Sequence, residues 1–484
     1  MRHPILITSL LALLGVASLA SAASAAPPVS SQAAHRALET ALDALSGPET
    51  LSAGPATGSR EATTALRDLA VALPALHGAD RRRALDLLAR PTDKSDRAYF
   101  GREAPRSPTC DARFCVHWTN KKANRPESRA FLSAIVESVG RSRNIENGAL
   151  GWRDPKPDGK LGSRHGRGAS GQVDVYVTNL GSKLYGYATT DSHQRGSRRH
   201  AYLVLDNDYT GFPSGPLKSM RVTVAHEYNH ILQFNYDVHE DSWLFEDTAT
   251  WMEEKVYPKI DDYLNYLSEF TEHPSRPMTG STTRIYAEAV WNHWLGARYG
   301  DDVVRDVWRV SPKQRSFAVD SYDEAIKDAG GGGFAPELGE FFAATAEWRA
   351  QPAFPDRAAY PNVDRFGTLG GATKKVKLDN TSFGLYDVHA PGSDPVTLSV
   401  EAEEGTRSSI SLVARQGPET SGTVTAVTRY LPKGGDGDVS LPNPGTYSRI
   451  TAVVANVDGR SDRRDRRGER VYRSDGSTYR LALG

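Results

Sequence analysis

Leucine and alanine recur at helical spacing in the first hundred residues of the chain. The leucines stand three or four positions apart in three short runs, 38–45, 66–69 and 85–88, and prolines separate the runs. This spacing places apolar side chains on one face of a helix. Because proline interrupts a helix, each helix must be short. We therefore predict a helical leader over residues 27–103.

The next part of the chain alternates strand-like and helix-like patterns. Apolar and β-branched residues gather at 114–118, 173–177 and 202–205, as is typical of buried strands. Apolar positions at 131–139 follow helical spacing, and further helical patterns continue beyond the third strand. A loop rich in glycine, arginine and serine separates the second and third strands. The order of elements predicts an α+β domain over residues 104–365.

A different pattern begins after a proline-rich stretch. Apolar residues alternate with polar ones at 396–400, 410–412, 424–426 and 479–483, and turn residues separate these segments. Such alternation is typical of strands with one buried face. We predict an all-β sandwich over residues 372–484.

Residues 1–26 have the composition of a secretion signal. A short basic start precedes an apolar run from Ile5 to Leu19, and small residues follow in two Ala-Ser-Ala sequences. The apolar run is too short to cross a bilayer, and no later stretch reaches about 18 uninterrupted apolar residues. We expect a soluble, secreted protein with no membrane partner.

Composition narrows the choice of partners. Lys plus Arg and Asp plus Glu number 59 each, so the net charge does not indicate binding to nucleic acid or to another polyanion. Cys110 and Cys115 are the two cysteines. In an exported chain such a pair is expected to form a disulfide.

The strongest chemical signal is the pattern H-E-x-x-H from His226 to His230. It follows Pro216, which favours the first turn of a helix. On a helix, residues four positions apart lie on one face, so both imidazoles can bind one metal ion. Glu227 lies about 100° around the helix from His226 and can reach a water molecule at the metal. Zn²⁺ polarises such a water, and a carboxylate takes its proton.

A catalytic zinc needs a third protein ligand, whose type distinguishes the known classes. The metzincin pattern requires glycine three residues and histidine six residues beyond His230. Gln233 and Tyr236 occupy these positions, which excludes that class.

A second helix offers the third ligand. The segment 241–254 has helical periodicity, and Glu246, Thr250 and Glu253 share one of its faces. Glu246 lies in the first turn, from which a returning helix can bring it to the metal. His239 is a rival for the same role.

These motifs resemble those of a known group. H-E-x-x-H followed by W-x-x-E-x-x-A resembles the gluzincins, zinc metallopeptidases of the thermolysin and hyicolysin type. The runs 226–233, 243–249 and 256–258 are similar to a bacterial family of secreted metalloprotease-like proteins with a helical leader and a β-rich C-terminal domain. The resemblance covers about residues 104–350. It implies an α+β zincin-type catalytic domain, in which a mixed sheet supports the active-site helices.

The resemblance also assigns roles to residues. It implies that His226, His230 and Glu246 bind zinc and that Glu227 is the general base. The related sequences commonly have glycine after the ligand glutamate, where this chain has Asp247. The Asp247 carboxylate either forms a hydrogen bond with a ligand histidine or is solvated.

Gluzincins often stabilise the reaction's oxyanion with a tyrosine or histidine from a later helix. The segment 284–294 offers Tyr286 and His293, of which we favour Tyr286. The alternative is an aromatic helix that only packs against the active-site helices.

A Ca²⁺ site is a further candidate. Residues 206–211 imitate the start of an EF-hand loop, but the twelfth position holds Leu217 in place of the usual glutamate. A turn before the active-site helix is the favoured interpretation.

The sequence predicts a secreted zinc-dependent endopeptidase that acts on protein or peptide substrates. The leader is either the propeptide of a zymogen or a permanent helical subdomain. Two other functions stay open: a zinc hydrolase with a non-peptide substrate, and a secreted binding protein with a vestigial zinc site. Glu227 counts against the second, because a vestigial site needs no general base. The oligomeric state is not predicted.

Overall fold

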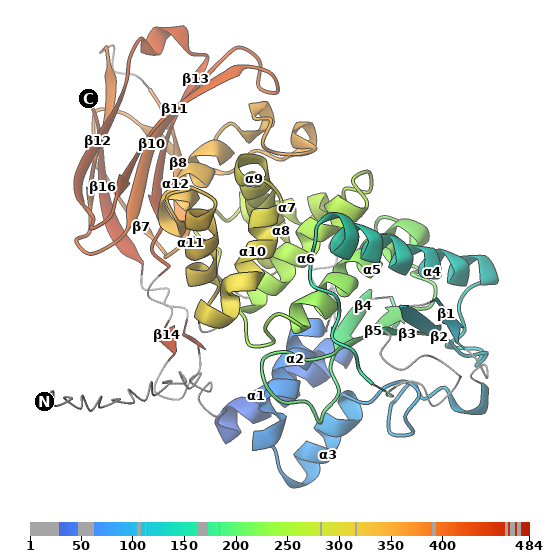
Figure 1. The fold of residues 1–484 in the computed structure, drawn as a ribbon. Coiled ribbons are helices and arrows are strands. Elements are labelled where there is room, and N and C mark those ends of the chain that lie inside the picture. The colour runs from blue at the N-terminus through green and yellow to red at the C-terminus, as the bar shows by residue number, and fades with distance from the viewer. Residues whose placement is uncertain are drawn as a thin grey trace, which may run out of the picture.

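The computed structural model is a mixed α/β chain with several sheets, which confirms the predicted mixture of helices and strands (Figure 1). The predicted secretion signal, residues 1–26, lies outside the described residues. No helix in the described part of the chain has the length and apolar character needed to cross a membrane. The structure describes residues 29–46, 62–103, 108–111, 113–159, 161, 173–182, 184–280, 283–314, 317–389, 394–459, 463–464, 470–471 and 476–484.

The predicted leader forms three helices, α1 (Ser31–Ser46), α2 (Thr63–Ala72) and α3 (Gly78–Leu87). Their apolar faces meet in one cluster, as the leucine spacing predicts. The leader residues at its centre include Leu38, Leu45, Leu66, Leu69, Leu73 and Leu88.

The first sheet contains five strands in the order β1-β2-β3-β5-β4. The pairs β2/β3 and β3/β5 are parallel, and the two edge pairs are antiparallel. The disulfide between Cys110 and Cys115 joins β1 to β2 and confirms the predicted pairing. The strands are β1 (Thr109–Cys110), β2 (Phe114–His117), β3 (Val173–Thr178), β4 (Gly186–Thr189) and β5 (Tyr202–Asp206).

Strand β4 corrects the sequence interpretation, which placed only a loop between the second and third strands. The strand has four residues, Gly-Tyr-Ala-Thr, and lies within a glycine-, arginine- and serine-rich stretch. Its alternation is too short to detect in the sequence. It forms the edge of the sheet, where its pairing with β5 holds it.

The first sheet is covered on both faces. Alternate strand residues point to opposite sides, so Val175 and Leu203 join the core formed with α4 (Arg129–Arg143) and α5 (Pro216–Phe234). Tyr176 and Tyr202 point the other way and pack against the leader. Figure 1 shows α4 and α5 on one side of the sheet and the leader helices on the other. The leader therefore completes this part of the fold as a third layer.

A group of helices connects this sheet to the C-terminal part of the chain. Helix α6 returns alongside α5, and the later helices share the same apolar core. These elements are α6 (Ser242–Val256), α7 (Leu267–Thr271), α8 (Arg284–Ala287), α9 (Ala289–Tyr299), α10 (Asp302–Val310), α11 (Ala318–Asp328) and α12 (Phe334–Thr345).

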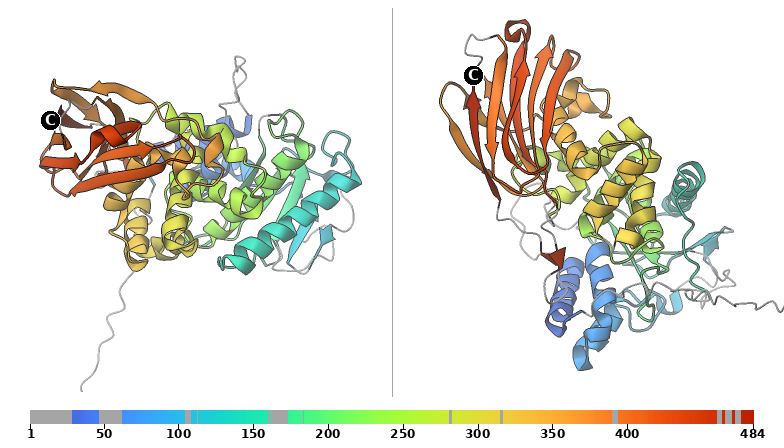
Figure 2. Two further views of the ribbon diagram at one scale, coloured as in Figure 1. Left: turned by 90° about the horizontal axis from the view of Figure 1, so that it is seen from above. Right: turned by 60° about the vertical axis from the view of Figure 1, so that its left-hand side comes forward.

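The C-terminal β unit consists of two sheets that face each other across their own apolar core (Figure 2). Their orders are β11-β10-β13-β8-β6 and β12-β9-β16-β7. The unit begins with β6, which pairs with β8. This strand precedes residue 372, the predicted start of the β-sandwich. The strands are β6 (Arg365–Leu369), β7 (Lys374–Leu378), β8 (Ser382–Val388), β9 (Val396–Ala402), β10 (Ser408–Gln416), β11 (Thr423–Leu431), β12 (Gly435–Leu441), β13 (Arg449–Asn456) and β16 (Ser477–Leu483).

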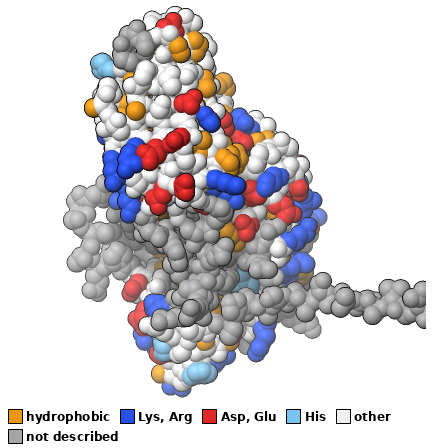
Figure 3. All heavy atoms as spheres, turned by 90° about the vertical axis from the view of Figure 1, so that its left-hand side faces the viewer, with side chains coloured by type: hydrophobic (Ala, Val, Ile, Leu, Met, Phe, Trp, Pro, Cys, Tyr) orange, Lys and Arg blue, Asp and Glu red, His pale blue; other side chains and the backbone are white. Residues whose placement is uncertain are grey.

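Helix α12 fixes the β unit to the helices. Gly339 lies so close to β10 that an added Cβ atom would come within 2.4 Å of the Ser409 hydroxyl oxygen. Phe342 of the same helix stacks on Phe383 of β8, with ring centroids 4.3 Å apart. On the face shown in Figure 3, charged side chains of both signs are interspersed, which agrees with the balanced composition.

Candidate metal centre

Helix α5 holds both histidines of the H-E-x-x-H pattern. It begins at Pro216, as predicted, and its last three turns are buried against the sheet and α6. His226 and His230 lie one turn apart with ring centroids 4.7 Å from each other. Their exposed fractions are 1% and 0%. The helix thus brings two imidazoles together in a space without solvent contact.

Helix α6 brings Glu246 to the same point. The Glu246 Oε2 atom lies 3.2 Å from His226 Nε2 and 3.5 Å from His230 Nε2. The three residues offer ligand atoms that all lie within 4.8 Å of one another. The predicted ligand set is therefore together in space, although its members come from two helices.

The Nδ1 atom of each imidazole, which faces away from Glu246, has an oxygen partner. His226 Nδ1 lies 2.8 Å from Glu253 Oε1, and His230 Nδ1 lies 2.6 Å from Gln233 Oε1. The Gln233 amide nitrogen lies 2.8 to 3.0 Å from three acceptor oxygens, which fixes the amide oxygen toward His230. Since both partners accept, each Nδ1 carries the proton and each Nε2 presents a lone pair to the centre.

The donor set fits a zinc ion. Two imidazole nitrogens and one carboxylate oxygen form one of the common catalytic zinc ligand sets. Glu246 Oε1 is buried and has no hydrogen-bond partner, so the carboxylate is not satisfied by the protein alone. A bound cation would satisfy it.

Glu227 lies on the adjoining face of α5 and is 1% exposed. Its Oε2 accepts a hydrogen bond of 2.9 Å from the hydroxyl of Thr63, in the leader helix α2. The same hydroxyl oxygen accepts the backbone N–H of Ala188, in strand β4, at 2.8 Å. Nothing in the sequence near Thr63 indicates this contact, because the partners are 164 residues apart.

The structure separates the two candidates for the oxyanion donor. Tyr286 is 5% exposed and its ring centroid lies 6.3 Å from that of His226. His293 packs against Tyr263, and burial lowers the pKa of its imidazole to about 3. Its described contacts do not include the three ligand residues. Tyr286 is the candidate beside the centre.

His239 and Asp247 do not have the positions that the sequence suggested for them. His239 is half-buried and lies outside the group formed by His226, His230 and Glu246. Asp247 is fully buried, so it is not solvated, and it accepts the hydroxyl of Tyr322 at 3.0 Å and not an imidazole. Burial, together with the charge of a nearby glutamate, raises the pKa of Asp247 well above its usual value.

A carboxylate that the sequence does not single out lies behind α5. Glu146 belongs to the π turn Asn144–Ala149 and is fully buried. Its Oε2 accepts the side-chain amide of Asn229 at 3.1 Å. Burial raises the pKa of Glu146 well above its usual value, although His226 and His230 act in the opposite direction.

Other carboxylates have partners or environments that account for them. Asp206, in the predicted turn, accepts three backbone N–H groups, from Leu180, Asp208 and Tyr209. This arrangement agrees with the turn interpretation of residues 206–211.

A second group of carboxylates lies at the end of α6. Glu254, Asp261 and Asp356 place ligand atoms within 4.8 Å of one another. Burial, followed by the charges of neighbouring carboxylates, raises the pKa of Glu254 to about 9. With its pKa raised in this way, Glu254 is protonated at neutral pH, which lowers the negative charge of the group.

Residues 213–325, which contain α5 and α6, match the model of a family of unknown function, DUF6055. No curated protein matches the chain.

Proposed function

We propose that the chain is a secreted zinc-dependent endopeptidase of the gluzincin type, with a zincin-type catalytic domain and a β-sandwich accessory domain. One observation carries the proposal: His226, His230 and Glu246 direct three ligand atoms to one point, and acceptors hold the outward nitrogen of both imidazoles. The signal-like residues 1–26 support secretion.

The proposed reaction is the attack of water on a peptide carbonyl. When bound, zinc supplies Lewis-acid chemistry that polarises the carbonyl and lowers the pKa of a nearby water. Glu227 accepts the proton of the attacking water and delivers it to the leaving amine. Its place one residue after His226 puts its carboxylate beside the metal ligands without making it one of them.

Tyr286 is the proposed oxyanion donor. A neutral phenol beside the centre can donate a hydrogen bond to the negative oxygen that develops on the attacked carbonyl. The tyrosine lies on α8 next to His226, where its hydroxyl can serve this role after substrate binds.

The test is hydrolysis of a peptide library by protein purified from the medium of secreting cells. We expect cleavage that o-phenanthroline abolishes and that added zinc restores. Glu227→Gln should reduce turnover by roughly 10² to 10⁴ while zinc stays bound, because it removes only the base. Cleavage that survives full chelation, or near-normal turnover by Glu227→Gln, would contradict the proposal. Hydrolysis of esters without any peptide cleavage would favour a non-peptide hydrolase.

A further inference from the structure

Helix α2 of the leader lies against the proposed active site. Thr63, Arg67 and Ala70 are spaced so that they share one face of this helix. The side chains of Thr63 and Arg67 contact strand β4 and the start of α6, and the Ala70 carbonyl accepts a hydrogen bond from Arg199, which precedes β5. Helix α2 thus lies against segments that flank the site.

Thr63 occupies the position next to the catalytic base. Its hydroxyl bridges Ala188 N–H and Glu227 Oε2, and its exposed fraction is 0%. The Ala188 N–H belongs to an edge strand, where an added peptide segment would take such a donor. The hydroxyl thus occupies one of the hydrogen-bonding positions of the Glu227 carboxylate. The bridge therefore takes a contact of the base and a backbone donor that a substrate strand would use.

Arg67, one turn further on, fastens the helix beside the third ligand. Its guanidinium donates to the Glu240 carbonyl at 3.0 Å and to the Ser242 hydroxyl at 2.8 Å. It also lies over the ring of Phe245, 4.4 Å from the centroid. Phe245 precedes Glu246 in the chain, so this contact covers the metal helix α6 itself.

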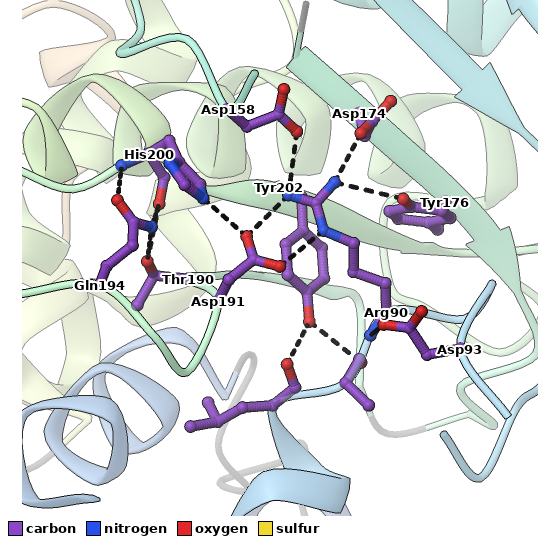
Figure 4. Close-up of polar contacts among 12 residues, drawn as sticks. Arg90, Asp93, Asp158, Asp174, Tyr176, Thr190, Asp191, Gln194, His200 and Tyr202 are labelled. Carbon is purple, nitrogen blue, oxygen red and sulfur yellow. Dashed lines mark hydrogen bonds and ion pairs between the residues drawn. The ribbon is translucent and has the colours of Figure 1, made fainter. Parts of the chain in front are cut away.

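The leader has anchors besides the hydrogen bonds of Thr63 and Arg67. Arg90, after α3, is 2% exposed and forms ion pairs with Asp158, Asp174 and Asp191 at 3.0, 2.5 and 2.7 Å. Figure 4 shows these carboxylates around the guanidinium, with Tyr202 beside it. The leader also packs on the sheet through its own apolar cluster. Weakening α2 would therefore leave the leader docked.

We propose that α2 is a built-in inhibitor and that the chain is latent while Thr63 and Arg67 hold α2 on the site. The inference rests on the proposed function, since it names what keeps that site inactive. The four residues His226, Glu227, His230 and Glu246 are each at most 1% exposed, and Glu227 is in direct contact with α2. Activity requires α2 to be displaced or removed.

The experiment compares the full chain, loaded with zinc, with the double variant Thr63→Val/Arg67→Met. Both changes keep side-chain bulk and remove the hydrogen bonds. The two readouts are the rate at which o-phenanthroline removes zinc and the rate at which a quenched fluorescent peptide is cleaved. We expect both rates to rise about tenfold or more in the double variant. Thr64→Val, a matched change at the neighbouring position of α2, should alter neither rate.

Unchanged rates in the folded double variant would overturn the inference, as would equal effects of Thr64→Val. Faster zinc removal without peptide cleavage would support α2 as the cover and would instead contradict the peptidase activity. If the double variant does not fold, Thr63→Val alone, which removes a single hydroxyl, is compared with Thr64→Val in the same two assays. An unchanged zinc-removal rate in that variant would overturn the assigned role of Thr63.

Discussion

Two buried polar clusters lie on opposite faces of the first sheet, and they compensate their charges differently. On the leader side, three carboxylates surround Arg90, and His117 and His200 contact two of them. On the α5 side, the Glu246 carboxylate lies beside the Nε2 atoms of two histidines. The first cluster contains its own cation. The second directs donors to one point and leaves a carboxylate oxygen unsatisfied.

The difference indicates which cluster requires a ligand. A buried carboxylate is costly unless an opposite charge or several donors compensate it. The guanidinium of Arg90 gives Asp191 two hydrogen bonds, and these contacts, against the effect of burial, keep the pKa of this aspartate below its usual value. No such group faces Glu246 among the described contacts of that residue. The first cluster therefore stabilises the fold, whereas the proposed function assigns a cation to the second.

The largest expected effect on stability comes from replacing Arg90, the cation of the first cluster. Arg90→Met leaves several carboxylates buried without compensation, which should lower the free energy of unfolding by about 3 to 5 kcal/mol. Urea unfolding followed by tryptophan fluorescence measures the change. Asp158→Asn is the control, because Arg90 keeps its two other partners, and it should have a much smaller effect. Equal stability of Arg90→Met and wild type would contradict the comparison.

The next effect concerns the carboxylate of the second cluster. Glu246→Gln replaces an anionic ligand with a neutral amide, so the zinc dissociation constant should rise roughly a hundredfold, about 2.7 kcal/mol. Competition with a chelating dye measures it. Glu254→Gln removes another buried carboxylate of α6 that is not a ligand, and zinc affinity should not change. If His239→Ala loses the metal and Glu246→Gln keeps it, the third ligand is misassigned.

A smaller effect is expected from the partner of His226 Nδ1. Glu253→Gln retains an oxygen acceptor but removes its charge, so the imidazole becomes a weaker donor to zinc. Zinc affinity should fall about tenfold, less than for Glu246→Gln. The same dye competition detects this difference. An effect as large as that of Glu246→Gln would indicate that Glu253 itself binds the metal.

How far the sequence predicts the site depends on the distance along the chain between its parts. Spacing within one helix predicts His226, Glu227 and His230 as site residues, and the resemblance to gluzincins implies Glu246 on the next helix. The geometry within each helix depends on contacts between neighbours in the chain, which periodicity captures. The disulfide and the helical leader were predictable for the same reason.

The parts that the sequence did not predict depend on distant contacts. Thr63 meets Glu227 across 164 residues, and Asn229 meets Glu146 across 83. A threonine in an alanine-rich helix and a glutamate in a turn carry no local sign of these partners. Strand β4 was missed because its four residues gain their strand geometry from pairing with β5. Tertiary packing decides such elements.

Zinc binding itself tests the central claim most directly. The full chain, saturated with zinc and freed of excess, should contain about one zinc ion. X-ray absorption at the zinc edge should show two imidazole nitrogens and further light oxygen ligands. His226→Ala should lose the metal, whereas Glu227→Gln should retain it. A wild-type chain that binds no zinc, or a His226→Ala variant that holds zinc as firmly as wild type, would contradict the account.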